Sequence, residues 1–395
     1  PILFIDGTDN GLVYKDRDDG KAAIAEVNLA TGAEVRTVVA PDAGDISGAI
    51  RAPDGSKLLG VHVADDLKPV RWLDPAMAAH QDTLDATARA ARVRIDSYSR
   101  DLTKMLVRIS TPDNPGLLYY YDSTTGDLSR LAAMNEQIGA KRLSRAKLVR
   151  YKARDGLEIE GVLTMPRGRA TTSLPFIVMP HGGPWGQDEL TYDYWAQFLA
   201  ERGYAVLQPN FRGSTGYGAE FEKAGEGQLG FAMQDVTDGV RWAVAEKIAD
   251  PKRVCVVGAS YGGYAAMWGI AKDPDQYRCA ISIAGVANLR REVNDFGGTL
   301  RANLYRTQWK RMTPDFAAVS PINAIDRIKA PLLLIHGKKD VTVDHSQSAR
   351  MYAAMTKAGK TVDFVSLPFA DHYFTREADR LLLLQSIESF LAKYN

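Results

Sequence analysis

The pattern of hydrophobic and polar positions changes near residue 145, and the two parts of the chain predict different structures. In residues 1–145, short runs with strand-like alternation are separated by turn clusters, such as Asp-Asn-Gly at 9–11 and Pro-Asp-Gly at 53–55. Strand-length runs bounded by such turns are typical of antiparallel β structure. We therefore expect residues 1–145 to form an all-β region.

An internal repeat within this region indicates the blades of a β-propeller. A segment that begins at Asp54 is echoed 47 residues later at Asp101, and the turn at 30–32 recurs at 124–126, at twice that offset. A period of about 40–50 residues with several strands per unit is typical of propeller blades. The region has room for about three blades. A helical insertion is expected near 75–91, where apolar residues recur at helical spacing.

From residue 146 onward, apolar strands alternate with amphipathic helices. A hairpin with an Asp-Gly turn at 155–156 comes first. Short apolar runs typical of buried strands follow it, at 176–179, 205–208, 254–257, 280–283, 332–335 and 363–366. Helical patterns lie between these runs, and a last one covers 376–393. The alternation predicts one α/β domain over 146–395, with a mostly parallel, doubly wound sheet covered by helices on both faces.

Composition and charge exclude several classes of protein. Of the 395 residues, 45% are hydrophobic and 25% are charged, which argues against disorder, collagen and coiled coils. The net charge of +1 provides no field that would attract nucleic acid or an anionic membrane. The longest apolar runs are far shorter than the roughly 18 residues that a membrane helix needs. The sequence thus predicts a soluble protein with neither nucleic acid nor membrane as a partner.

The cysteines and the start of the chain say little about its compartment. Cys255 and Cys279 lack metal or redox spacing and lie in apolar runs, which predicts two buried free thiols. The chain begins at Pro1 without an initiator methionine or a signal peptide, so we expect a processed or truncated product. The sequence leaves open whether the protein is cytoplasmic or periplasmic, and it does not determine the oligomeric state.

The strongest chemical motif is Gly-Ala-Ser-Tyr-Gly at 258–262. It lies between the apolar run at 254–257 and a helical stretch at 264–272. In this context GxSxG predicts a nucleophile elbow, because a tight, strained strand-to-helix turn needs glycines on both sides of a serine that stands clear of the sheet. The following helix also points its positive N-terminus at developing negative charge. Ser260 is therefore the predicted nucleophile; the alternative is a glycine-rich turn with an incidental serine.

A serine hydroxyl needs a base to take its proton, and that base should follow an orienting acid along the chain. His345 opens a predicted helix after the run at 332–335, where a surface or capping role fits better. His372 lies after the last strand and before the closing helix, where a hydrolase of this topology presents its base. We predict that His372 acts as general base and then as general acid.

The orienting carboxylate should come directly after the strand at 332–335, and Asp340 lies there. Asp371 is a rival, but a carboxylate adjacent in sequence to the base is poorly placed to reach its far ring nitrogen. Asp344 is a weaker rival. We predict that Asp340 fixes the tautomer of His372 and stabilises its charged form.

A tetrahedral intermediate would also need hydrogen-bond donors for its oxyanion. The backbone N–H of Tyr261, directly after the predicted nucleophile, is one expected donor. The second should come from the loop after the strand at 176–179, where Gly182 and Gly183 let the backbone approach closely. His181 is expected to brace this loop by hydrogen bonds and not to react.

No motif indicates a cofactor or a metal. The glycine-rich loop at 211–218 lacks the Lys-Ser/Thr of a P-loop and the spacing of a dinucleotide site, so we expect it to be structural. The sequence contains neither HExxH nor paired Cys/His spacing. We therefore predict chemistry carried by side chains alone.

Several motifs together carry a resemblance to a known family. They are HGGP at 181–184, NFRGSTGYG at 210–218, GASYGGY at 258–264, SPINAIDRIKAPLLLIHGKKD at 320–340 and the DH pair at 371–372. With the propeller-like repeats, they make the chain similar to the prolyl oligopeptidase family of serine peptidases. The HGGP form looks more like its acylaminoacyl peptidase and dipeptidyl peptidase branches. The resemblance implies an α/β-hydrolase domain behind a propeller, and it carries over Ser260, Asp340 and His372 as the triad.

The resemblance also implies a substrate pocket. Tyr261 and Val343 would line the pocket for the residue that precedes the scissile bond. Leu289, Val293 and Phe296 are apolar candidates for its other wall, with core packing as the alternative. Family members carry a complete propeller, so this chain is expected to associate with a missing N-terminal propeller portion.

The sequence thus predicts a serine peptidase that hydrolyses short peptides through an acyl-enzyme. An esterase or lipase with the same triad is one alternative, because a fold does not determine which acyl group is attacked. A binding module with a catalytically silent hydrolase is the other. The motifs do not distinguish among aminopeptidase, dipeptidyl, acylaminoacyl, endo-oligopeptidase and isopeptidase activities.

Overall fold

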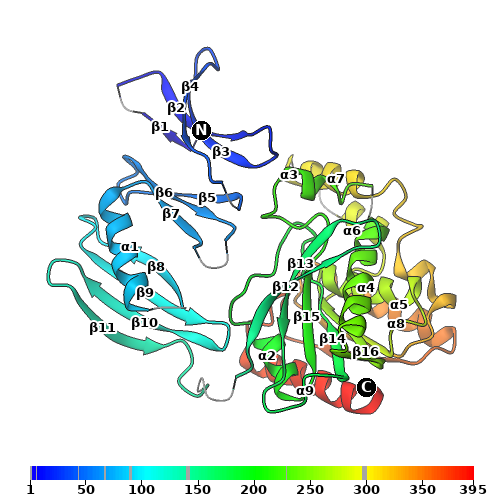
Figure 1. Ribbon diagram of the computed structural model, residues 1–395. Helices are drawn as coiled ribbons and strands as arrows, with labels where there is room; N and C mark the ends of the chain where they lie inside the picture. Colours follow the sequence, from blue (N-terminus) through cyan, green and yellow to red (C-terminus); the bar gives the residue numbers. More distant parts are fainter. Residues whose placement is uncertain are drawn as a thin grey trace. The chain divides into compact units, whose positions relative to one another are not determined.

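The computed structural model describes most of the chain (Figure 1). The described residues are 2–5, 7–42, 44–65, 68–88, 91–138, 143–227, 229–295 and 300–395. The chain divides into two compact units. Unit 1 comprises residues 1–143, 189–194 and 215–221, and unit 2 comprises residues 144–188, 195–214 and 222–395.

In its described residues, unit 1 consists of antiparallel sheets in which strands follow one another in chain order. The first sheet contains β1 (Leu3–Phe4), β2 (Asn10–Asp16), β3 (Ala22–Asn28) and β4 (Glu34–Val39). The second contains β5 (Ile46–Arg51), β6 (Leu58–Val63) and β7 (Val70–Trp72). The third contains β8 (Arg92–Tyr98), β9 (Lys104–Thr111), β10 (Asn114–Asp122) and β11 (Asp127–Ala133). Small sheets of sequential strands are the form that propeller blades take.

These sheets bury their apolar faces against one another, as stacked blades must. One buried cluster joins Leu12 and Ile24 of the first sheet to Ile46 and Val61 of the second. The alternation of side chains along each strand directs these residues to one face. The stacking of neighbouring sheets therefore supplies the core that a single small sheet lacks.

A helix, α1 (Pro75–Thr87), lies between β7 and β8. The side chain of its N-cap, Asp74, accepts hydrogen bonds from the N–H groups of Ala76 and Met77, which satisfies donors that the first turn leaves free. Met77 and Leu84 pack against apolar residues of the third sheet. The helix thus covers a face of that sheet.

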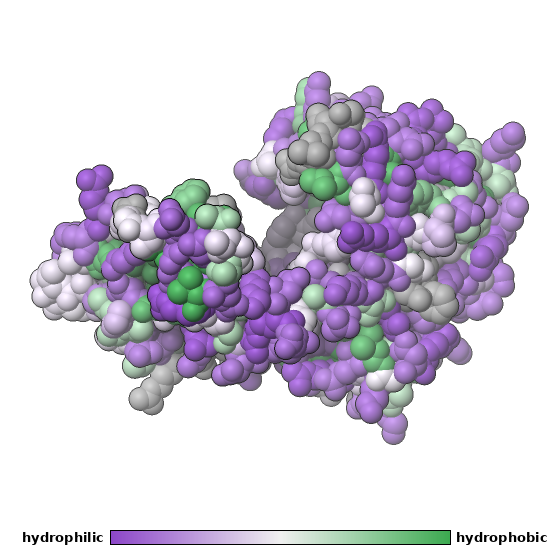
Figure 2. Space-filling view, turned by 90° about the horizontal axis from the view of Figure 1, so that it is seen from above, coloured by the Kyte–Doolittle hydropathy of each residue, from purple (hydrophilic) through white to green (hydrophobic). Residues whose placement is uncertain are grey.

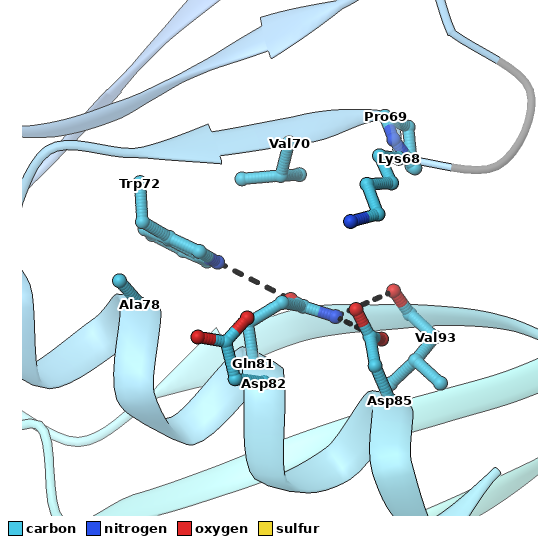
Figure 3. A pocket seen from close by; sticks show the side chains of 9 residues that line it. All are labelled: Lys68, Pro69, Val70, Trp72, Ala78, Gln81, Asp82, Asp85 and Val93. Atoms are coloured by element: carbon cyan, nitrogen blue, oxygen red, sulfur yellow. Dashed lines mark hydrogen bonds between the residues drawn. The ribbon is translucent and has the colours of Figure 1, made fainter. Parts of the chain in front are cut away.

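A cavity of about 120 Å³ remains between α1, β7 and β8 (Figure 3). Gln81 crosses it, accepting a hydrogen bond of 3.2 Å from Trp72 Nε1 and donating bonds of 2.9 Å to Asp85 Oδ1 and 3.1 Å to the Val93 carbonyl. This network ties the helix to both neighbouring strands. The cavity is part of unit 1, whereas every predicted site residue belongs to unit 2.

Unit 2 is built on an eight-stranded sheet of order β12-β13-β15-β14-β16-β17-β18-β19. Its strands are β12 (Ala146–Lys152), β13 (Glu158–Thr164), β14 (Leu174–Val178), β15 (Ala205–Asn210), β16 (Ala249–Ala259), β17 (Cys279–Ile283), β18 (Leu332–Gly337) and β19 (Val362–Leu367). The first two strands are antiparallel to their neighbours, and all later pairs are parallel. The predicted mostly parallel sheet is confirmed.

Helices cover both faces of this sheet (Figure 1). The helices along the chain are α2 (Tyr194–Glu201), α3 (Ala219–Lys223), α4 (Leu229–Ala245), α5 (Tyr261–Lys272), α6 (Leu289–Asp295), α7 (Leu300–Met312), α8 (Ser346–Lys357) and α9 (Glu377–Tyr394). A large buried cluster joins α2 and α9 to one face of the central strands, and α4, α5 and α8 pack on the other. Strands buried on both faces read as continuous apolar runs, which is why the sequence pattern located them.

The two cysteines form a disulfide, so the prediction of free thiols is wrong. Cys255 on β16 and Cys279 on β17 are direct partners in the parallel register, with their Cα atoms 4.7 Å apart. Sequence spacing carried no sign of this bond, because strand pairing alone brings the two residues side by side. Both residues are fully buried, as the apolar runs around them indicated.

The surface is mostly hydrophilic on the face that Figure 2 presents, with hydrophobic residues scattered among polar ones. Scattered apolar residues are normal on a protein surface. Within the described ranges, no helix has both the length and the apolar character needed to cross a bilayer.

Candidate active site

Ser260 lies on a sharp turn between β16 and α5. Its backbone has φ 57° and ψ −120°, a conformation that L-residues rarely adopt. The turn is held from both sides, because the Ser260 N–H donates to the Ile283 carbonyl at 2.9 Å and the Tyr264 N–H donates to the Ser260 carbonyl at 3.0 Å. The surrounding fold thus imposes the strained backbone on this serine.

The glycines of the motif are required by close backbone approaches. A Cβ at Gly258 would lie 2.4 Å from the Gly262 carbonyl oxygen, and a Cβ at Gly262 would lie 2.1 Å from the Pro180 carbonyl oxygen. Real Cβ atoms do not make such contacts, so only glycine fits at both positions. The elbow is therefore packed directly against the loop that follows β14.

That loop brings Gly182 to Ser260. A Cβ at Gly182 would lie 3.5 Å from the Ser260 Cβ. Beside it, His181 Nδ1 lies 2.7 Å from the Gly182 carbonyl oxygen and His181 Nε2 lies 2.8 Å from Ser214 Oγ. Burial lowers the pKa of His181 to about 4, so the ring is neutral near pH 7. Its hydrogen bonds link the Gly182 loop to Ser214, as expected of a residue that braces the loop.

The loop at 211–218 is anchored by a buried ion pair. Arg212 binds Asp235 through Nε at 2.8 Å and through its second guanidinium nitrogen at 2.7 Å, and it reaches Asp155 at 2.7 Å. Burial raises the pKa of the Asp235 carboxyl, and the hydrogen bonds from Arg212 oppose this shift. Because Ser214 lies in this loop and contacts His181, the ion pair also supports the Gly182 loop.

Asp340 and His372 meet where the loops after β18 and β19 run together. The Lys338 N–H donates to the Leu367 carbonyl at 2.8 Å, and the Lys339 N–H donates to the Ala370 carbonyl at 3.0 Å. His372 Nδ1 lies 2.7 Å from Asp340 Oδ2. The structure thus brings together two residues that are 32 positions apart in sequence.

The carboxylate of Asp340 is fully buried and receives several hydrogen bonds. Its Oδ1 accepts from the N–H groups of Thr342 and Val343 at 2.8 and 2.9 Å. Burial alone would raise the pKa of Asp340, but hydrogen bonds from His336, from His372 and from the Val343 N–H outweigh it and hold the pKa below its ordinary value. Asp340 is therefore ionised at neutral pH.

The rival residues have other partners. Asp371 accepts hydrogen bonds from the N–H groups of Tyr373 and Thr375 and from the Thr375 hydroxyl. Asp344 accepts from the Ser346 N–H at the start of α8. His345 Nε2 lies 2.8 Å from Ser366 Oγ. These contacts stabilise the loop conformations around the candidate site.

Four of the predicted residues lie in loops at one edge of the sheet. Gly182, Ser260, Asp340 and His372 follow β14, β16, β18 and β19, which all run in the same direction. In open α/β sheets, ligands bind outside the carboxyl ends of the parallel strands. The structure pairs Gly182 with Ser260 and Asp340 with His372 at this edge.

The predicted pocket residues are buried. Val343 is 3% exposed, and the Tyr261 ring packs on Phe211, Tyr264 and Trp309 with centroid distances of 5.3–6.4 Å. Leu289 and Val293 are also buried, which agrees with core packing. Phe296 lies outside the described residues.

Sequence reasoning missed two features near these residues. An aromatic group formed by Trp185, Tyr305 and Trp309 adjoins Tyr261, and its signal was the i, i+4 spacing of Tyr305 and Trp309. His336 lies 3.2 Å from Asp340 Oδ2, and its signal was the i, i+4 spacing from Asp340. Among the described residues, no group of three or more His, Cys, Asp or Glu side chains is placed to hold a metal ion.

Comparisons with known proteins show the family of the chain. A family model described as "Prolyl oligopeptidase family" matches residues 190–395. The chain is 32% identical to dipeptidyl aminopeptidase BIII of Pseudoxanthomonas mexicana over 414 residues, which cover 99% of this chain and 58% of that protein. It is 28% identical to the human acylamino-acid-releasing enzyme over 55% of this chain and 31% of that protein. The chain thus spans little more than half the length of the first of these relatives.

Solved structures show the fold. A puromycin-hydrolyzing peptidase of Mycobacterium tuberculosis matches with a TM-score of 0.80 and 22% identity, over 98% of this chain and 60% of that one. The acylaminoacyl peptidase of Pyrococcus horikoshii matches with a TM-score of 0.75 and 22% identity, over 98% and 62%. The predicted fold class is confirmed: an α/β-hydrolase domain preceded by the sheets of a partial β-propeller.

Proposed function

Because the chain belongs to the prolyl oligopeptidase family, we propose that it carries the catalytic site of a serine peptidase that hydrolyses short peptides. The observation that carries this proposal is the 2.7 Å hydrogen bond between His372 Nδ1 and Asp340 Oδ2. It lies at the sheet edge that also presents Ser260 on a strained turn. Relatives named as a dipeptidyl aminopeptidase and as an acylamino-acid-releasing enzyme support peptide substrates.

In the proposed mechanism, Ser260 Oγ attacks the scissile carbonyl and His372 Nε2 accepts the hydroxyl proton. Since Nδ1 of His372 is engaged by Asp340, Nε2 is the ring nitrogen left for this transfer. The ionised Asp340 stabilises the imidazolium that forms. His372 then donates the proton to the leaving amine, and water hydrolyses the acyl-enzyme by the same steps.

The proposed oxyanion donors are the N–H of Tyr261, at the N-terminus of α5, and an N–H of Gly182 or Gly183. The bond between His181 and the Gly182 carbonyl supports this role, because that carbonyl and the Gly183 N–H belong to one rigid peptide unit. Each donor is expected to contribute about 3 kcal/mol of transition-state stabilisation. Tyr261 and Val343 are the proposed wall for the residue that precedes the scissile bond.

We also propose a division into a partial propeller over 1–145 and a catalytic domain over 146–395. The stacked antiparallel sheets before residue 143 support this boundary. A further propeller portion is the proposed partner of residues 1–145.

A fluorophosphonate probe tests the nucleophile. The probe is expected to label the protein stoichiometrically, because an activated serine attacks its phosphorus. Ser260→Ala should abolish labelling, and Ser389→Ala, at an exposed position on α9, should leave it unchanged. Labelling that persists in a folded Ser260→Ala variant would refute the assignment.

A further inference from the structure

His336 is a second imidazole on the carboxylate of Asp340. It belongs to β18 and is completely buried. Its Nε2 lies 3.2 Å from Asp340 Oδ2 and 3.0 Å from the Val343 carbonyl oxygen. His372 Nδ1 reaches the same Oδ2 at 2.7 Å. One carboxylate oxygen is therefore shared by two histidines.

The neighbours of His336 determine which ring nitrogen carries its proton. Both groups beside Nε2 are oxygen acceptors, so Nε2 must be protonated to donate to them. On the other side, Nδ1 lies 2.8 Å from the hydroxyl oxygen of Ser348 on α8, and this hydroxyl can donate to an unprotonated nitrogen. We assign the neutral Nε2–H tautomer from this network.

Titratable groups approach this pair from several elements. His345, at the start of α8, has its ring centroid 5.5 Å from that of His336. The charges of Asp344 and Lys338, in the loop after β18, also act on this cluster. Glu292 on α6 interacts electrostatically with Asp340, and burial raises the pKa of Glu292 to about 7. A test must therefore change His336 while leaving these groups in place.

We propose that His336 is a positioning residue for the peptidase site, which orients the Asp340 carboxylate and weakens its hold on the proton-bearing Nδ1 of His372. The inference rests on the function proposed above. A carboxylate oxygen that already accepts one hydrogen bond attracts a second donor less strongly. Removing the His336 donor should therefore stabilise the imidazolium form of His372, so that the neutral base becomes available only at higher pH.

Two amide substitutions separate this role from packing alone. In His336→Gln, the amide nitrogen can reach the place of the imidazole Nε2 and keep the donor. In His336→Asn, the amide nitrogen falls near the place of Nδ1 and cannot reach Asp340. We expect the acidic limb of the kcat/KM profile to move up by about 0.5–1 pH unit in His336→Asn and to stay near the wild-type position in His336→Gln.

The same shift should appear without catalysis. In the full chain labelled with ¹⁵N-histidine, the NMR titration midpoint of His372 should move upward in His336→Asn by the amount seen in the kinetics. This readout distinguishes the two proposals: a moved midpoint in a protein without peptidase activity would refute the proposed function and support the contact. If His336→Asn does not fold, His336→Leu serves in its place, because leucine fills much of the volume of the imidazole and offers no donor to Asp340.

The inference has a clear contrary result. Unchanged acidic limbs and midpoints in both His336→Asn and His336→Leu would overturn it. Equal loss of kcat in the Asn and Gln variants with no shift of either limb would also overturn it, because that result indicates a packing role only.

Discussion

At the scale of single residues, the candidate site depends on a strained backbone and on a buried charge, both of which are energetically unfavourable by themselves. Ser260 has a positive φ, and the Asp340 carboxylate is buried completely. Each is compensated locally, Ser260 by two backbone hydrogen bonds and Asp340 by two N–H groups and two imidazoles. Strained and buried polar groups of this kind cluster at functional sites.

Glu292 is a buried carboxyl that the proposed chemistry does not use, and it makes a pH-dependent contribution to stability. Its pKa is raised to about 7, chiefly by burial, so the folded state binds its proton more tightly than the unfolded state does. The contribution of Glu292 is therefore most favourable below its unfolded pKa of roughly 4.3 and declines as the pH rises to about 7.

Glu292→Gln should remove this decline. We compare the urea midpoint of Glu292→Gln with that of wild type at each pH. The difference is expected to favour the variant more at pH 8 than at pH 4, because glutamine cannot ionise. Urea unfolding of both proteins at the two pH values measures the difference. An equal offset at pH 4 and pH 8 would contradict the assignment of a raised pKa.

At the scale of elements, glycine positions determine how closely the loops at the sheet edge approach one another. A Cβ at Gly337, the last residue of β18, would lie 2.1 Å from the carbonyl oxygen of Ala370. Asp340 lies three residues after Gly337, and His372 lies two residues after Ala370. The contact between Gly337 and Ala370 therefore determines the separation of the loops that carry Asp340 and His372. The sequence pattern located both strands but carried no sign of the contact.

Gly337→Ala should therefore reduce activity. The added methyl must push the two loops apart, and overpacking of this kind costs about 1–3 kcal/mol. We expect a lower melting temperature and at least tenfold slower fluorophosphonate labelling. Gly48→Ala is the matched control, because its Cβ would meet only ordinary contacts of 3.4 Å or more. Similar labelling rates in both variants would show that the contact does not position the site.

At the scale of the whole molecule, charge and composition predict neither nucleic acid nor a membrane as a partner, and peptide substrates belong to the proposed function. A net charge of +1 offers no long-range steering, so we expect the proposed substrate to be recognised by local contacts. The chain covers 58% of the Pseudoxanthomonas relative, so the substrate class is tested directly on this chain.

A panel of short peptides with free and blocked N-termini tests the proposed activity. We expect mass spectrometry to detect peptide-bond cleavage that Ser260→Ala abolishes. Release of dipeptides from free N-termini would indicate a dipeptidyl peptidase, and release of a blocked first residue would indicate an acylaminoacyl peptidase. Cleavage of aryl esters without any peptide cleavage would contradict the peptidase proposal and favour an esterase.

The sequence by itself determined the secondary structure of the α/β domain and the candidates for its chemistry. The buried strands are apolar throughout and lie between helical patterns. The local sequence pattern was therefore sufficient to locate them. The GxSxG motif was recognisable because a tight strand-to-helix turn requires glycines on both sides of the serine. The choice of Asp340 over Asp371 followed from the order of strands and from the reach of a neighbouring side chain.

Only the tertiary structure decided the contacts between distant segments. The disulfide between Cys255 and Cys279 depends on the register of two paired strands, and the sharing of Asp340 Oδ2 by His336 and His372 depends on the meeting of two loops. Residue types and spacings along one segment do not predict such contacts between distant segments. They arise when the whole sheet assembles, because the direction and register of neighbouring strands determine which side chains share its carboxyl edge.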